Sequence, residues 1–356
     1  MARDPQVDLI FSHFTPRYIA TGVDPNDLER LVARIDRWAD WCRLWSEEAG
    51  RHERLASEAA QKNRHATAAE CHLRAAIYYH YGKHLFAVAP EEYRRAHEDM
   101  LRCYTAAAAG IDPPMQRVEF PFEGVAMPGW LRLPRDVARP PAAIILPGLD
   151  ACKEELHAWS NAFVKRGLAS LTLDGPGQGE TAFRLPIRPD WGRVIGAVID
   201  VLEKRPDVDG RRVGVVGQSL GALYAPLAAA GEPRIRACIA NCGPFDWGAT
   251  LPKMPKVSQE VFLARSHAKT MEQAQELANQ MTLDGKADRI RCPLLIVFGG
   301  GDRLIAPSEG ERLSKAASGL VEFVLFEEGN HVCFNISYRF RPLTADWMAE
   351  TLTSPR

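Results

Sequence analysis

The chain has 356 residues, of which 46% are hydrophobic and 25% charged, and its formal net charge is −1. This balance gives no general electrostatic reason to expect a nucleic-acid or anionic-membrane partner. No run approaches the roughly 18 apolar residues of a membrane-spanning helix. The chain also opens without a basic stretch followed by an apolar run, so we expect a cytoplasmic protein.

Eight cysteines are scattered along the chain, and none forms a CxxC pair or a Cys/His group with zinc-ligand spacing. We expect them to be free, buried thiols, because a cytoplasmic chain of this length does not need disulfides. The sequence therefore predicts neither a metal site nor a cofactor.

The first part of the chain, residues 1–112, is predicted to be a helical, cap-like region. Apolar residues recur at helical spacing from Asp24 to about Ala109. Asp24 followed by Pro25 is a helix-start signal, and Gly110 is a stop signal. Two further helices are expected over residues 66–86 and 91–109.

Residues 113–356 are predicted to form an α/β domain, because short β-rich runs alternate with helical ones. The later runs are continuously apolar, which is typical of strands buried on both faces of a mostly parallel sheet, here of eight strands. A helical insertion is expected over about residues 245–289. The predicted strands are 117–122, 129–133, 142–146, 169–173, 212–216, 235–240, 294–298 and 321–326. The predicted helices are 154–166, 191–204, 220–230, 308–317 and 342–352.

The strongest chemical signal is the G-x-S-x-G pattern of residues 217–221, which falls where a predicted strand ends and a helix begins. A serine on such a sharp turn projects its hydroxyl from the sheet, and the flanking glycines avoid collisions with neighbouring backbone. We therefore predict that Ser219 is a nucleophile.

A serine nucleophile needs a base, and the base needs an orienting group. In the α/β-hydrolase fold these follow the serine in the order acid, then histidine. Asp302 lies in the turn after the strand predicted over 294–298, and His331 follows the strand predicted over 321–326. We predict that His331 is the base and that Asp302 orients it.

The oxyanion hole of this fold uses two backbone N–H groups, one from the residue after the nucleophile and one from the turn after the third strand. These requirements select Leu220 and Leu149. The glycine-rich segment 174–180 invites a dinucleotide-loop interpretation, but Glu180 stands where that motif requires glycine. A packing role near the pocket is expected for this loop instead.

Five segments, PGLDACKEE, DGPGQGE, GQSLGA, GGGDRLIAP and EEGNHVCFN, occur in this order behind the helical front. Together they resemble an α/β-hydrolase group that includes 2,6-dihydroxypseudooxynicotine hydrolase, fungal polyketide-shortening pigment hydrolases and fermentation–respiration switch esterases. The resemblance implies the triad Ser219, Asp302 and His331, no cofactor, and hydrolysis of a carbon–carbon bond next to a ketone. Some members carry an assisting glutamate at the start of the cap. Here the nearest carboxylate is Asp246, which becomes a candidate auxiliary acid.

The expected function is hydrolysis of a β-diketone or acyl-phenol compound through an acyl-serine. A carboxylesterase acting on small or aromatic esters is the main alternative. A prolyl-oligopeptidase-like peptidase and a non-catalytic binding protein are weaker ones. The expected partner is a small-molecule substrate, and a homodimer is left open. Side chains suited to line the substrate pocket are Tyr78, Tyr79, His80 and Trp247.

Overall fold

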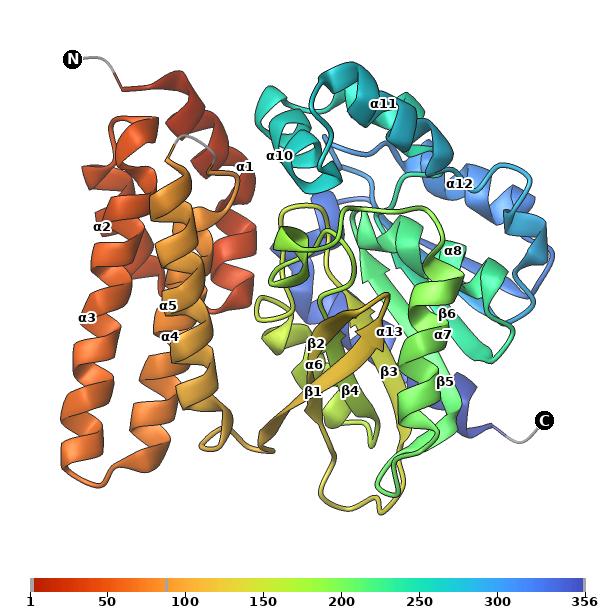
Figure 1. The fold of residues 1–356 in the computed structure, drawn as a ribbon, viewed down its shortest axis with the longest axis horizontal. Coiled ribbons are helices and arrows are strands. Elements are labelled where there is room, and N and C mark those ends of the chain that lie inside the picture. Colours follow the sequence, from red (N-terminus) through yellow and green to blue (C-terminus); the bar gives the residue numbers. More distant parts are fainter. Residues whose placement is uncertain (1–2, 87–88, 355–356) are drawn as a thin grey trace. The chain divides into compact units, whose positions relative to one another are not determined.

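The computed structural model describes residues 3–86 and 89–354 (Figure 1). Contacts divide the chain into two compact units, Met1–Gln116 and Arg117–Arg356. The first is helical, and the second contains one eight-stranded sheet with its helices. Within the described ranges, no helix combines the length and apolarity needed to cross a membrane. All eight cysteines are buried and free.

The first unit is built from five helices that bury a shared aromatic core. Aspartates cap the first two, since Asp4 and Asp24 each accept a backbone N–H and each precedes a proline at the first helical position. Trp41 and Trp45 are fully buried in this core. The helices are α1 (Pro5–Thr21), α2 (Pro25–Arg34), α3 (Trp41–Gln61), α4 (His65–Lys83) and α5 (Pro90–Ala108).

The start of the helical region differs from the prediction in two ways. Helix α1 lies before Asp24, and it buries Phe11, Phe14 and Tyr18 against the aromatic core. The apolar periodicity that runs on from Leu28 is interrupted, because α2 ends at Arg34 and α3 begins at Trp41. Periodicity shows which residues face the core, but it does not show that one helix carries them all.

The second unit contains the predicted eight-stranded sheet, in the order β1-β2-β4-β3-β5-β6-β7-β8. Strand β2 runs antiparallel to β4, and β4, β3, β5, β6, β7 and β8 are parallel neighbours. All eight strands lie where the sequence predicts them. They are β1 (Met115–Phe122), β2 (Val125–Arg132), β3 (Pro141–Leu146), β4 (Ala169–Leu173), β5 (Asp209–Gln218), β6 (Ile235–Asn241), β7 (Leu294–Gly299) and β8 (Val321–Phe326).

Helices pack on the sheet in two groups, with α6 against α13 and α7 against α8. Helix α13 begins before the predicted start at Pro342, because Phe340 is buried and packs edge-on against Trp159. The segment 245–289 contains three α-helices and two short 3-10 helices. The bounds are α6 (His157–Val164), α7 (Trp191–Leu202), α8 (Gly221–Gly231), α9 (Trp247–Thr250), α10 (Lys256–Ser266), α11 (Met271–Gln280), α12 (Pro307–Ala316) and α13 (Ser337–Thr353).

Candidate active site

Ser219 stands on the turn between β5 and α8, with the left-handed φ of 54°. Such a backbone is costly for a residue with a side chain and recurs at functional turns. The glycines on either side have no room for a side chain. A Cβ on Gly217 would lie 1.9 Å from the carbonyl oxygen of Gly221, and one on Gly221 would lie 2.5 Å from that of Leu146. The G-x-S-x-G pattern is therefore required by the sharpness of this turn.

The structure brings Ser219, His331 and Asp302 together from three separate turns. The Nε2 atom of His331 lies 2.9 Å from Oγ of Ser219, and its Nδ1 atom lies 2.7 Å from Oδ2 of Asp302. The turns follow β5, β7 and β8, and these strands end at the same edge of the sheet because they are parallel. This is the geometry of a hydroxyl, a base and an orienting carboxylate.

The carboxyl group of Asp302 is fully buried and firmly held. Its Oδ1 atom accepts the backbone N–H of Leu304 at 2.8 Å and of Ile305 at 3.0 Å, which leaves Oδ2 for His331. Burial by itself raises the pKa of Asp302, but the charge of His331 and these hydrogen bonds outweigh burial, so the pKa lies below its usual value. The group is thus a carboxylate that can stabilise an imidazolium.

The backbone around the histidine and the serine is also constrained. Val332 and Cys333, which follow His331, both have positive φ, at 62° and 59°. A β-branched residue rarely adopts this conformation. The N–H of Ser219 donates to the carbonyl oxygen of Asn241 at the end of β6. The sequence offers no signal for Asn241, and the segment EEGNHVCFN contains Val332 and Cys333 without showing their left-handed backbone.

The turn after β3 lies directly beside the serine. A Cβ on Gly148 would lie only 3.0 Å from Cβ of Ser219, so glycine permits this close approach. Among the described residues, none accepts a hydrogen bond from the backbone N–H of Leu149 or from that of Leu220. The two predicted oxyanion donors lie on segments that meet at Ser219, and both N–H groups are available to a ligand. Their assignment to the oxyanion hole stays a prediction.

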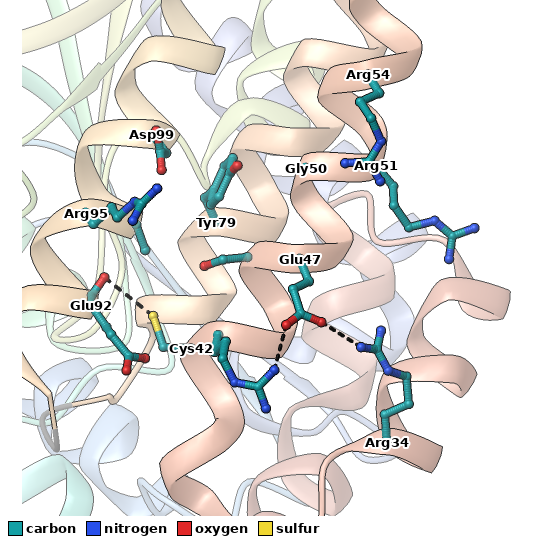
Figure 2. Close-up of a pocket in the computed structure, with 13 residues that line it drawn as sticks. Arg34, Cys42, Glu47, Gly50, Arg51, Arg54, Tyr79, Glu92, Arg95 and Asp99 are labelled. Atoms are coloured by element: carbon teal, nitrogen blue, oxygen red, sulfur yellow. Dashed lines mark hydrogen bonds and ion pairs between the residues drawn. The ribbon is translucent and has the colours of Figure 1, made fainter.

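Tyr78 and Tyr79, expected in the substrate pocket, have partners inside the helical unit. The hydroxyl of Tyr78 donates to Asp27 at 2.6 Å, and that of Tyr79 donates to Glu53 at 2.6 Å. Tyr79 also lines a hollow of about 780 Å³ in this unit (Figure 2). The other lining residues are Arg34, Cys42, Arg43, Ser46, Glu47, Gly50, Arg51, Arg54, Glu92, Arg95, Ala96 and Asp99. His80 is fully buried, with its ring near those of Tyr81 and His84.

Trp247 and Asp246 lie at the start of the insertion. Trp247 is buried and meets Phe262 edge-on at 5.6 Å, as a core residue would. Asp246 caps α9, since its Oδ1 accepts the N–H of Ala249 at 2.9 Å, and its Oδ2 accepts the hydroxyl of Thr282 at 3.2 Å. The carboxylate thus has a structural role, and its role as an acid stays a prediction.

Two buried cysteines are poor candidates for a nucleophile. Burial raises the pKa values of Cys238 and Cys242 well above normal, which disfavours the thiolate.

One group in the described residues has metal-ligand spacing, namely Asp27, Glu48 and His52. Arg30 forms ion pairs with both of its carboxylates, and Nε2 of His52 donates to Oδ2 of Asp27 at 2.7 Å. We interpret the group as an ion-pair cluster between α2 and α3.

Over residues 26–322, the chain matches the family described as Esterase FrsA-like. The chain belongs to this family. Its resemblance to α/β-hydrolases and the predicted fold class are thereby confirmed. Since its relatives are hydrolases, the protein is an enzyme of the α/β-hydrolase type.

The similarity of this FrsA-like chain extends over nearly its whole length. It is 30% identical to 2,6-dihydropseudooxynicotine hydrolase of Paenarthrobacter nicotinovorans over 345 residues, 95% of this chain and 91% of the relative. A crystal structure of 2,6-dihydroxy-pseudo-oxynicotine hydrolase superimposes with a TM-score of 0.87, 29% identity and 95% coverage of both chains. The α/β hydrolase gkaG of Penicillium citrinum is 32% identical over 252 residues, 66% of this chain but only 59% of the fungal protein.

Proposed function

We propose that the protein hydrolyses a carbon–carbon bond next to a carbonyl group in a small molecule, with Ser219, His331 and Asp302 as its catalytic triad. The observation that carries the proposal is the hydrogen-bonded chain from Ser219 through His331 to Asp302. It occurs in a protein whose similarity to a pseudooxynicotine hydrolase spans 95% of its length. A β-diketone or an acyl-phenol is the substrate class that this chemistry suits.

In the first half of the reaction, Nε2 of His331 takes the Ser219 proton as Oγ attacks the carbonyl carbon. The resulting oxyanion is stabilised by the N–H groups of Leu149 and Leu220. Collapse of this intermediate breaks the bond to the leaving carbon. The electron pair stays on that carbon, which takes the proton held by the imidazolium, either directly or relayed through an auxiliary acid, for which Asp246 is the candidate. His331 is neutral again at the end of this half.

In the second half, His331 removes a proton from water, and the hydroxide attacks the acyl-serine. The second tetrahedral intermediate collapses, the carboxylic acid leaves, and the proton on His331 returns to Ser219. One water is consumed for each bond broken, and no redox change occurs. The chemistry therefore needs no cofactor.

A carboxylesterase is the second candidate, and two observations favour it. The family is described as esterase-like. Both carboxylate oxygens of Asp246 also have structural partners, one in the helix cap and the other the hydroxyl of Thr282. An oxygen leaving group departs more easily than carbon, so an esterase needs no auxiliary acid.

We also propose that the helices of residues 1–112 act as a cap over the substrate. Support comes from the pseudooxynicotine hydrolase structure, because the match includes the helical part of the chain. The insertion over about residues 245–289 is proposed as a second cap element. The predicted pocket side chains Tyr78, Tyr79, His80 and Trp247 belong to these two segments.

The deciding experiment is a paired kinetic screen of 1,3-diketones and acyl-phenols against aryl esters. The Ser219→Ala variant, which should lose several orders of magnitude in turnover, supplies the background. We expect diketone or acyl-phenol cleavage by the wild-type enzyme that the variant lacks. Ester hydrolysis alone would establish the carboxylesterase instead. A Ser219→Ala variant with more than a tenth of wild-type activity would refute the triad.

A further inference from the structure

Two loops beside the serine are joined by buried polar contacts that the mechanism above does not use. One is the turn of residues 147–153, which follows β3 and contains Leu149. The other is the glycine-rich loop of residues 174–180, which follows β4. Strands β3 and β4 are parallel neighbours, so both loops leave the sheet at the same edge.

The side chain of Gln178 connects the two loops. It is almost completely buried, with 1% of its surface exposed. Its Nε2 donates to the carbonyl oxygen of Pro147 at 2.6 Å, and its Oε1 accepts the N–H of Gly175 at 3.0 Å. Both ends of the amide are thus used, so the side chain is held in one orientation.

A buried lysine makes the second connection. Nζ of Lys153 is fully buried and lies 2.9 Å from Asp174, 2.7 Å from Glu154 and 2.6 Å from Glu180. Its backbone N–H also donates to Asp174 at 2.8 Å. Gly179 is needed for this arrangement, because a Cβ there would overlap Oδ2 of Asp174 at 1.9 Å. Buried ion pairs contribute little net stability because desolvation is expensive, but they specify a geometry.

These contacts fix the backbone on both sides of Gly148, where the chain could otherwise rotate. The carbonyl of Pro147 belongs to the same peptide plane as the N–H of Gly148, and the next plane carries the N–H of Leu149. A glycine can rotate between these planes at low cost. The N–H of Leu149 keeps a fixed direction only if the plane before Gly148 is anchored, and Gln178 anchors it. Lys153 fixes the far end of the same turn.

We propose that Gln178 is a positioning residue of the oxyanion hole, with the Lys153–Asp174 ion pair securing the other end of the turn. This inference rests on the proposed function, because it assumes that the N–H of Leu149 stabilises the oxyanion formed on Ser219. Loss of one oxyanion donor typically lowers turnover by about 10²- to 10³-fold. Because Gln178 acts through the backbone, a variant should lose about 10- to 100-fold.

The test replaces Gln178 in two ways in the full chain. Gln178→Glu keeps the shape but removes the donor to Pro147, and Gln178→Asn keeps the amide but is too short to reach. The readouts are kcat and KM for an aryl ester and the inhibition constant of phenylboronic acid, whose tetrahedral adduct with the serine resembles the oxyanion. Rates are expressed per serine titrated with a fluorophosphonate, so partial misfolding does not affect them.

We expect kcat to fall about 10- to 100-fold in both variants, with KM within about threefold of wild type, and boronate affinity to fall in parallel with kcat. Thr351→Val is the matched control. The hydroxyl of Thr351 likewise donates to a backbone carbonyl, that of Trp347, at 2.7 Å, but near the end of α13. It should leave all three constants unchanged.

Two outcomes would overturn the inference: kcat within threefold of wild type in both variants, or a loss of kcat with unchanged boronate affinity. Failure of the proposed triad has a different signature, because wild-type Ser219 would then not react with the fluorophosphonate. Failure of carbon–carbon cleavage alone would leave both this reaction and the aryl-ester assay intact. A wild-type enzyme that reacts, beside a Gln178→Glu variant of equal kcat, would refute the positioning role alone.

Discussion

Replacing Asp302 by asparagine changes the triad without changing its shape. In the wild-type protein, Oδ1 accepts the backbone N–H groups of Leu304 and Ile305, and Oδ2 faces Nδ1 of His331. In the variant, the two N–H groups require the amide oxygen at the Oδ1 position. The amide NH2 group must then face His331.

This reversal selects the wrong tautomer of the base. The NH2 group can only donate, so Nδ1 of His331 must accept and the ring proton moves to Nε2. Nε2 then cannot take the proton of Ser219, which lies 2.9 Å away. In a serine protease the same exchange lowers kcat by about 10⁴-fold. We expect a loss of that order here, which corresponds to about 5 kcal/mol of transition-state stabilisation.

The assay is the single-turnover acylation rate with an aryl ester, beside thermal unfolding to establish that the variant is folded. Asp24→Asn is the matched control, because Asp24 also accepts a backbone N–H, from Asn26 at 2.8 Å, at a helix start in the first unit. Asparagine caps helices as well as aspartate does, so this control should keep full activity. A folded Asp302→Asn variant with more than a tenth of the wild-type rate would refute the role given to Asp302.

Two further predictions concern acid stability and the leaving group. Burial, with a smaller effect of Arg132, lowers the pKa of His157 to about 3, so below about pH 6.5 the unfolded chain binds a proton that the folded chain does not. Above pH 6.5, His157 should therefore not lower the free energy of unfolding. As the pH falls from 6.5 towards 3, the free energy of unfolding should decrease by up to about 1.4 kcal/mol per pH unit. His157→Gln should flatten this slope in urea titrations between pH 6.5 and 4, and an unchanged slope would contradict the assignment. Asp246→Asn, which preserves the helix cap, should lower hydrolysis of a diketone or acyl-phenol about 10²-fold or more and that of an aryl ester much less; equal losses on both substrates would leave Asp246 a purely structural residue.

The sheet and the motif positions could be predicted from the sequence because their causes are local. A strand segment buried on both faces must be apolar, so β7 and the inner parts of β5 (residues 213–216) and β6 (residues 237–240) stand out as continuous apolar runs. The turn after β5 admits only glycine at Gly217 and Gly221. Because parallel strands end at one edge of the sheet, the residues after them could be predicted to meet, and Ser219, His331 and Asp302 do.

Other features depended on contacts between distant segments. Helix α1 is stabilised by burial of its aromatic residues against α3, and nothing in its own periodicity shows that partner. Tyr78 and Tyr79 face carboxylates of the helical unit, but an aromatic run on a helix fits a core and a substrate pocket equally well.

What the sequence by itself determined about this protein is the order of its strands and helices and the candidates for its nucleophile, base and acid. Only the tertiary structure decided how the charged and polar residues of the two loops are used. Lys153, Asp174 and Glu180 would be interpreted as exposed charges, yet they form an ion-pair cluster in which Lys153 and Asp174 are fully buried, beside the turn that carries Leu149. The physical reason is that a charge can be buried only where an opposite charge meets it, and that meeting depends on how β3 and β4 pair.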